Sequence, residues 1–149
     1  MAYNTIVVKG YPMRKEAVAA EAITPGHLMS LNSSNRLIKH AVAAGNSNAT
    51  FAIENEVFGQ GIDVAYANND NVLYGIFAPG DEVNALVAAS AAAIVIGDYL
   101  ESAGNGTLRK VTTAAATADT SRSSIVAKAL QAVDNSAGGS QARILVEIV

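Results

Sequence analysis

The chain of 149 residues contains no cysteine and no tryptophan, and only 15% of its residues are charged. The absence of cysteine excludes disulfide scaffolds, thiolate zinc sites and thiol catalysis, and it suits a protein made in a reducing cytosol. The aromatic share is only 5%, so the chain has few of the rings on which carbohydrate-binding modules stack sugars. Several classes of protein are therefore disfavoured before any motif is considered.

The charge balance argues against two further kinds of partner. The net charge is -3, the sequence pI is about 5.3, and the basic residues are scattered singly along the chain. We therefore expect neither nucleic acid nor an anionic membrane as a partner. The first ten residues, MAYNTIVVKG, lack a basic region followed by a long apolar run, so no secretory signal is predicted and synthesis in the cytoplasm is expected.

Groups for catalysis or metal binding are sparse. The only histidines are His27 and His40, and no motif adds a nucleophile or further metal ligands to them. The segment 68–71, NNDN, lacks the glycine and the distal glutamate of a calcium-binding loop. Acidic residues form three close pairs that a solvated strand edge explains equally well: Glu54 and Glu56, Asp81 and Glu82, Asp98 and Glu101. We expect no enzyme, no metal and no cofactor.

What the chain does contain is a repeat. Residues 23–40 and 94–111 align without a gap, each with a glycine, a short run, a turn of small residues and a second run. The second copy carries Asn105-Gly106, which suits a tight hairpin turn because both residues accept a positive φ. Residues 78–87 repeat the opening glycine-containing step. Four pairs fall in register: Gly26 with Gly97, Met29 with Leu100, Leu37 with Leu108, and Lys39 with Lys110. The repeat predicts two equivalent β-hairpins, the first turning at 32–35.

Short β-like runs continue along the rest of the chain. Residues 14–21 fit either one helical turn or a strand, and residues 82–96 mix alanines with sheet-favouring residues, so that we predict mainly strand there. Residues 112–124 are predicted to form an exposed loop. Further strands are expected at 51–53, 62–66, 72–77, 125–133 and 143–149. Turn signals every 8–12 residues predict a mainly β fold, a hairpin-built barrel or sandwich-like domain.

The beginning of the chain reads as a separate element. A strand-like run at 5–8 is ended by Gly10-Tyr11-Pro12, which is typical of an extended arm. We therefore divide the chain into an N-terminal arm, 1–13, and a single β-rich domain, 14–149, that we expect to fold without the arm. The alternative, in which the arm pairs within its own sheet, is equally open.

The order of three segments resembles a known family. AITPGHLM, IFAPGDEV and IVIGDYLESAGNGTLRKV, followed by an Ala/Thr-rich stretch and by SIVAKALQAV and ARILVEIV, are similar to the head decoration, or capsid cement, proteins of tailed bacteriophages. The resemblance covers most of the chain from residue 23 onward. It implies a non-enzymatic virion subunit, a homotrimer on the outer surface of the capsid. There it would bind the major capsid protein at three-fold or quasi-three-fold positions.

The composition agrees with a subunit that acts through surfaces. Half of the residues are hydrophobic, yet most of these are small, so the fold gains from burying more surface against a neighbour. The arm supplies the candidates for contact with the capsid: Tyr3, Thr5, Ile6, Val7, Val8, Tyr11 and Met13. The alternative function is a small-ligand or carbohydrate-binding β-barrel module of a virion.

Overall fold

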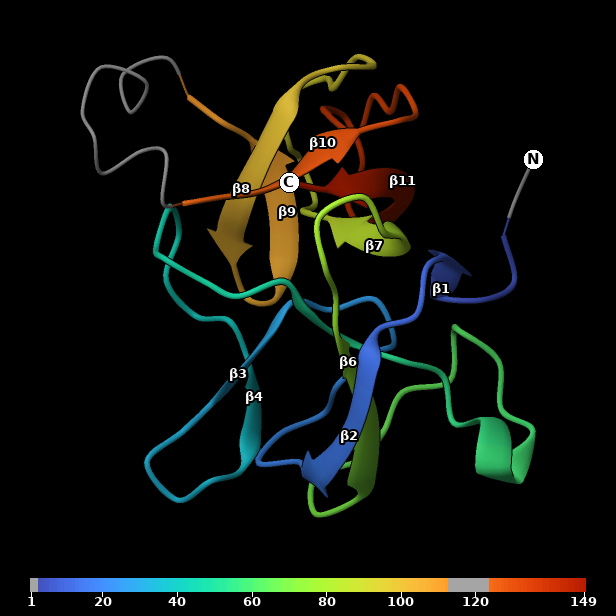
Figure 1. The fold of residues 1–149 in the computed structure, drawn as a ribbon. Coiled ribbons are helices and arrows are strands. Elements are labelled where there is room, and N and C mark those ends of the chain that lie inside the picture. Colours follow the sequence, from blue (N-terminus) through green and yellow to red (C-terminus); the bar gives the residue numbers. More distant parts are fainter. Residues whose placement is uncertain (1–2, 113–123) are drawn as a thin grey trace.

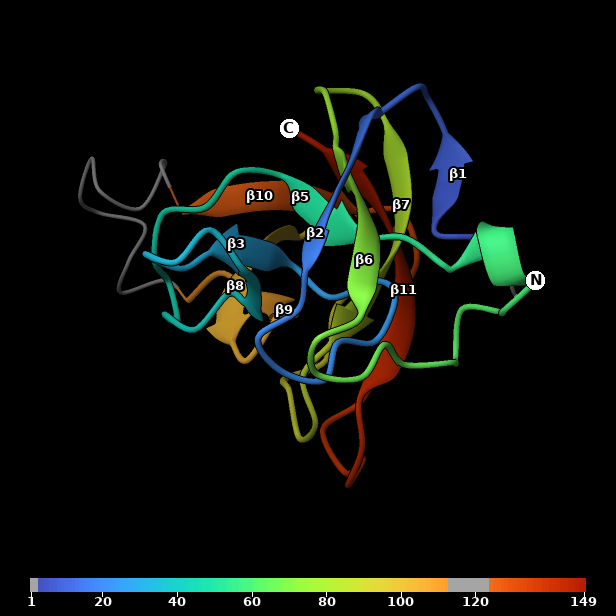
Figure 2. The ribbon, with the colours of Figure 1, turned by 90° about the horizontal axis from the view of Figure 1, so that it is seen from below.

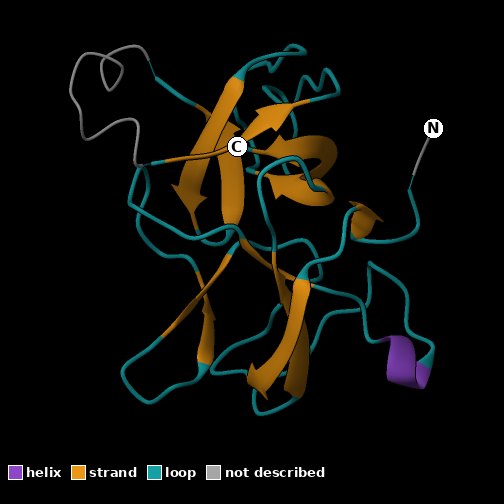
Figure 3. Cartoon of the chain, viewed as in Figure 1, coloured by secondary structure: helices purple, strands orange, loops and turns teal. Residues whose placement is uncertain are grey.

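The computed structural model describes residues 3–112 and 124–149 and confirms the mainly β fold. A closed five-stranded barrel fills the upper half of Figure 1, and two smaller sheets extend below it. Among the described residues the single helix is a 3-10 turn, η1 (Glu56–Phe58), which is purple in Figure 3. Residues 113–123 of the expected loop lie outside the described part of the chain.

The barrel is an antiparallel sheet closed on itself by one parallel contact. Its strands follow the order β7 (Glu82–Val87), β11 (Ala142–Ile148), β10 (Ile125–Ala129), β8 (Tyr99–Gly104) and β9 (Thr107–Lys110). The ring closes where Val87 of β7 pairs with Leu108 of β9. Ile144, Val146 and Ile148 share the buried face of β11.

The lower half, toward the viewer in Figure 2, has its own sheets. Three antiparallel strands follow the order β2 (Met13–Val18), β6 (Asn71–Ile76) and β5 (Thr50–Ala52), and β3 (Met29–Leu31) pairs with β4 (Leu37–Lys39). The ambiguous segment 14–21 is thus a strand as far as Val18. The lower core consists of Ala19, Ile23, Met29, Leu37, Ala52, Tyr66, Val72 and Tyr74.

The two predicted hairpins have the same register. Met29 lies opposite Lys39 in the first hairpin, and the aligned residues Leu100 and Lys110 lie opposite each other in the second. The second turn has φ values of 55° at Asn105 and 72° at Gly106, as that residue pair predicts. The internal repeat in the sequence is therefore a repeat of structure.

The turn that opens each repeat also recurs. Its glycine has φ values of 92° at Gly26, 95° at Gly80 and 94° at Gly97. The next side chain accepts a hydrogen bond from the main-chain N–H three residues earlier: His27 from Thr24 at 3.0 Å, Asp81 from Ala78 at 2.9 Å and Asp98 from Val95 at 2.9 Å. A glycine followed by a short acceptor side chain thus specifies the turn locally.

Three strand predictions are wrong in part. The segment 125–133 is a strand only as far as Ala129. Two other segments differ more. The segment 62–66 is not a strand: residues 62–63 form a turn and only Tyr66 pairs, through an isolated bridge with Ile23. The segment 82–96 is a strand only as far as Val87, because the chain turns at 89–90, where Ser90 has a φ of 55°. In both places tertiary contacts replace the local preference for an extended backbone.

Candidate functional site

The N-terminal arm is part of the barrel sheet. Its strand β1 (Val7–Lys9) pairs antiparallel with β7, with Val7 opposite Val83. The side chain of Ile6 is fully buried in the barrel core. Its main-chain N–H donates to Glu54 Oε2 at 3.1 Å, and its carbonyl accepts from the N–H of Asn84 at 2.9 Å. The structure thus shows the alternative in which the arm pairs within its own sheet.

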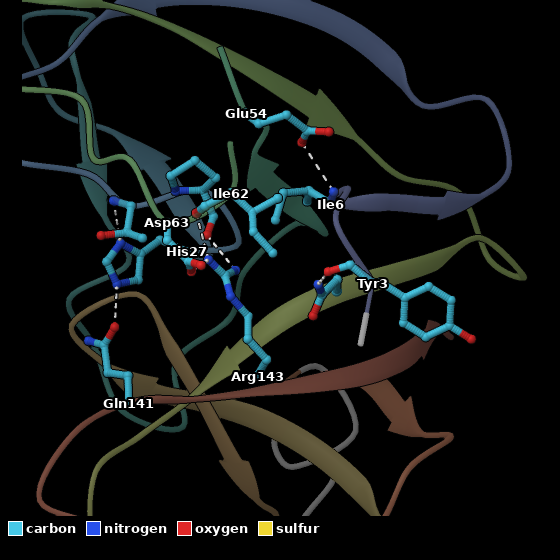
Figure 4. A network of polar contacts seen from close by, with 11 residues as sticks. Tyr3, Ile6, His27, Glu54, Ile62, Asp63, Gln141 and Arg143 are labelled. Atoms are coloured by element: carbon cyan, nitrogen blue, oxygen red, sulfur yellow. Dashed lines mark hydrogen bonds and ion pairs between the residues drawn. The ribbon is translucent and has the colours of Figure 1, made fainter. Parts of the chain in front are cut away.

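A polar network ties the arm and two loops to the barrel (Figure 4). Arg143 on β11 donates from Nη1 to the carbonyl of Pro25 at 2.7 Å and from Nη2 to the carbonyl of Ile62 at 2.6 Å. Asp63 lies 3.2 Å from the same Nη2. Gly26 is required here, because a Cβ atom would lie 2.4 Å from Nη1 of Arg143. Arg143 therefore fixes loops that belong to the lower half onto a barrel strand.

His27 extends this network to Gln141 (Figure 4). Its Nδ1 accepts from the N–H of Thr24, so the neutral ring carries its proton on Nε2, which donates to Gln141 Oε1 at 3.1 Å. Burial lowers the pKa of His27 to about 4, since the protonated ring would be charged in an enclosed site. The ring is a neutral structural linker between the turn and the barrel.

His40 lies elsewhere and has different partners. Its Nδ1 is 2.7 Å from Ser102 Oγ and its Nε2 is 3.1 Å from the carbonyl of Asn46. The two histidines therefore do not form one site. No group of three or more His, Cys, Asp or Glu side chains suited to a metal ion occurs within residues 3–112 and 124–149.

The three acidic pairs also have structural partners. Glu54 binds the arm, and Asp81 and Asp98 accept from the main chain in the repeated turns. The others form ion pairs: Glu56 with Arg14, Glu82 with Lys9, Glu101 with Arg109, and Asp98 a second time with Lys110. Each carboxylate of these pairs is thus engaged in holding the fold.

The seven arm residues fall into three groups. Ile6 is a core residue, which corrects its assignment as a capsid contact, because its side chain cannot reach a partner. Tyr3, Val7 and Val8 are half-buried. Thr5, Tyr11 and Met13 are exposed, Tyr11 completely. Tyr11 and Met13, at the junction of β1 and β2, are therefore the large side chains among the proposed anchors that are presented to solvent.

A groove in the lower half has a volume of about 690 Å³. We call it the lower groove. Leu31, Val42 and Ile76 line it although their exposed fractions are 49%, 62% and 36%. Met13 lies directly opposite Ile76 across β2 and β6, so its side chain continues the same face. The full lining is Lys15, Met29, Ser30, Leu31, Leu37, Ile38, His40, Ala41, Val42, Asn46, Ser47, Asn48, Thr50, Tyr74 and Ile76.

Sequence reasoning did not find this groove. Its walls come from the first hairpin, the following loop and the three strands of another sheet, which only the fold brings together. The usable signal in the sequence was Met13, which had been assigned to the arm. A groove assembled from distant segments leaves no spacing pattern along the chain.

The fold is similar to that of a protein of known structure. The chain is similar to the N base of the head fiber protein gp8.5 of bacteriophage phi29, with a TM-score of 0.57 and 11% sequence identity. The match covers 93% of this chain and 95% of that chain, so the two share a fold over nearly their whole lengths. No family model matches the sequence, and no curated protein matches it. None of the described helical residues forms a segment long and apolar enough to cross a bilayer.

Proposed function

We propose that the chain is a structural protein of a tailed-phage head, a decoration protein that binds the outer surface of the capsid and stabilises the lattice of the major capsid protein. The observation that carries this proposal is the fold shared with a phage head fiber base over 93% of the chain. The segment order that resembles capsid cement proteins supports it independently. The protein acts without catalysis, as a homotrimer at three-fold or quasi-three-fold positions.

The engagement of the candidate catalytic groups supports a role through surfaces. His27 and His40 lie in separate hydrogen-bonded sites, and the paired carboxylates hold turns, the arm or cations. The exposed apolar side chains, in contrast, are not buried in either core of the described fold. Met13, Leu31 and Val42 together give one face an apolar surface suited to another protein.

The test compares the melting of mature heads with and without the added protein. A ligand that binds only the assembled lattice stabilises it by RT ln(1 + [L]/Kd), about 2.7 kcal/mol per site at a hundredfold excess over Kd. A trimer that contacts three capsid subunits gains further through effective concentration. Decorated heads should melt at a higher temperature. Equal melting at saturating, verified occupancy would contradict the stabilising role, and an absence of binding would contradict the proposed function.

A further inference from the structure

The side chain of one lysine, Lys15, has no polar partner in the described part of the fold. Among the lysines and arginines that the structure describes, only Lys15 has a side chain with neither an ion pair nor a hydrogen bond. Its neighbour Arg14, on the other face of β2, pairs with Glu56 at 2.9 Å. Lys15 instead lines the lower groove. Its ammonium is available to a ligand there.

One buried hydroxyl is also left without a partner. Ser47 Oγ is the single buried side-chain oxygen or nitrogen in the described residues that makes no hydrogen bond. Buried polar atoms are normally paired, so such an exception asks for an explanation. Ser47 lines the same groove as Lys15. The unpaired lysine and the unpaired buried hydroxyl therefore belong to residues that line one groove, and an occupant that offers a carboxylate and a hydrogen-bonding group would match both.

Besides the Lys15 ammonium and the Ser47 hydroxyl, the apolar rim of the groove is a third feature that an occupant must match. Leu31, Val42 and Ile76 stand exposed around it, and Met13 continues this apolar surface along β2. The occupant must therefore be long enough to cover several aliphatic side chains, to bring a carboxylate to Lys15 and to offer a hydrogen-bonding group to Ser47. An extended peptide segment has all three features, because its main chain supplies the polar partner.

Within residues 3–112 and 124–149, a second copy of the chain offers no Asp or Glu side chain that is without a partner. Every described Asp and Glu already has a hydrogen bond or ion pair within its own chain. Using one of them in a neighbour's groove would share or break an existing contact. Charge complementarity therefore points to a different protein as the partner.

We propose that the lower groove binds an extended segment of the capsid protein in which aliphatic residues adjoin an Asp or Glu. The carboxylate pairs with Lys15, the aliphatic side chains cover Leu31, Val42 and Ile76, and a polar main-chain group bonds to Ser47 Oγ. This assignment rests on the proposed function and adds to it the face that meets the capsid and the chemistry that this face recognises.

Charge reversal on β2 supplies a matched pair of variants. Lys15→Glu and Arg14→Glu change neighbouring residues of the same strand on opposite faces, and binding to undecorated heads is titrated at low and high salt. Lys15→Glu should weaken binding about tenfold at low salt, with a smaller effect at high salt, because it places like charges together. Arg14→Glu should stay within about twofold of the unchanged protein.

The apolar rim is tested in the same way. The double variant with Leu31→Ser and Val42→Ser should weaken binding by about tenfold or more, since it removes apolar contact area. Its control is Val57→Ser with Phe58→Ser, a pair on η1 with exposed fractions of 77% each. The control should bind heads as the unchanged protein does. Circular dichroism and thermal melting of every free variant establish that it is folded.

Ser47→Ala separates a binding role from a structural one. Removing an unpaired buried hydroxyl should leave the free protein as stable as before or more stable. If the occupant bonds to that hydroxyl, the same variant should nevertheless bind heads several-fold more weakly. If Ser47→Ala binds heads as tightly as the unchanged protein or more tightly, the assignment of Ser47 Oγ as a partner of the occupant is contradicted.

The outcomes distinguish this inference from the proposed function. If the unchanged protein fails to bind heads, the proposed function fails. If it binds but Lys15→Glu and the rim variant bind equally well, the groove is not the contact and this inference is overturned. If the groove variants instead change the sedimentation of the free protein and leave head binding intact, the occupant is a second copy, which also overturns it.

Discussion

The buried carboxylate of Glu54 accepts a hydrogen bond from the main-chain N–H of Ile6 at 3.1 Å. This contact joins the loop before η1 to the arm, 48 positions apart in the sequence. Glu54→Ala should lower the free energy of unfolding by about 1.5–3 kcal/mol, because it leaves a buried donor without its charged acceptor. Urea unfolding measures this loss, and hydrogen exchange at the Ile6 amide should accelerate. Glu54→Gln, which keeps an acceptor oxygen, should lose less; an equal loss would contradict the hydrogen-bond explanation.

Removal of residues 1–11 should destabilise the domain. The deletion takes Ile6 out of the barrel core and β1 off the edge of β7. Shortening this side chain alone, in Ile6→Ala, should cost about 2–5 kcal/mol, as for other buried aliphatic residues. The truncated protein should melt at a lower temperature, and its open β7 edge should promote association in sedimentation experiments. Unchanged melting would restore the view that the domain does not need its arm.

Two glycines with the same backbone angle should respond differently to alanine. Gly26 and Gly97 have φ values of 92° and 94°. At Gly97 no atom lies within 4 Å of an added Cβ, so Gly97→Ala should cost only backbone strain, about 1 kcal/mol. At Gly26 the added atom would meet Arg143 at 2.4 Å and the carbonyl of Asn84 at 2.9 Å. Gly26→Ala should therefore cost about 3 kcal/mol or more in chemical denaturation. Equal losses of unfolding free energy in the two variants would show that Arg143 can move away from an added Cβ atom at little cost.

His27 should make stability depend on pH in mildly acidic solution. Its pKa is about 4 in the folded protein, against an ordinary value of 6.5, so between these values the unfolded chain binds more protons than the folded one. The free energy of unfolding should therefore fall as the pH drops from 6.5 to 4, by roughly 3 kcal/mol from this group, and remain at the lower level below pH 4.

The matched variant for this effect is His27→Asn. An asparagine side chain keeps an oxygen that can accept from the Thr24 N–H, as the aspartates do in the other copies of the turn. Denaturant unfolding at a series of pH values should show a shallower slope for the variant between pH 6.5 and 4. Parallel slopes for the two proteins would assign the pH dependence to other groups.

The sequence predicted the locally encoded parts of this fold well. Asn105-Gly106 and the glycine-acceptor turns determine their own geometry, and the repeat placed Met29 and Leu100 at equivalent positions. The segment 62–66 misled the prediction because its alternation mimics a strand, while in the structure the carbonyl of Ile62 bonds to Arg143, which lies 81 positions later. Such a distant partner leaves no signal near the residue it positions.

The difference between local signals and distant contacts also explains which candidate site residues could be predicted from the sequence. The sequence indicates Tyr11 and Met13 because they are large side chains next to Gly10 and Pro12, which end the first strand. Both side chains are exposed in the structure. Ile6, in the same stretch, could not be separated from them, since burial depends on the pairing of β1 with β7. The lower groove was missed altogether, because Lys15 and Ser47 come to line one groove only after the sheets assemble.

The position of β11 in the barrel has a consequence for synthesis. This strand, Ala142–Ile148, lies between β7 and β10 and hydrogen-bonds to both. While the chain emerges from the ribosome, both neighbours therefore expose a bare edge until residue 148 has left the exit tunnel. Hairpins such as β8–β9 can form early from local contacts, whereas closure of the ring waits for the most distant pairing. Chaperones would thus matter most in the interval just before this strand is inserted.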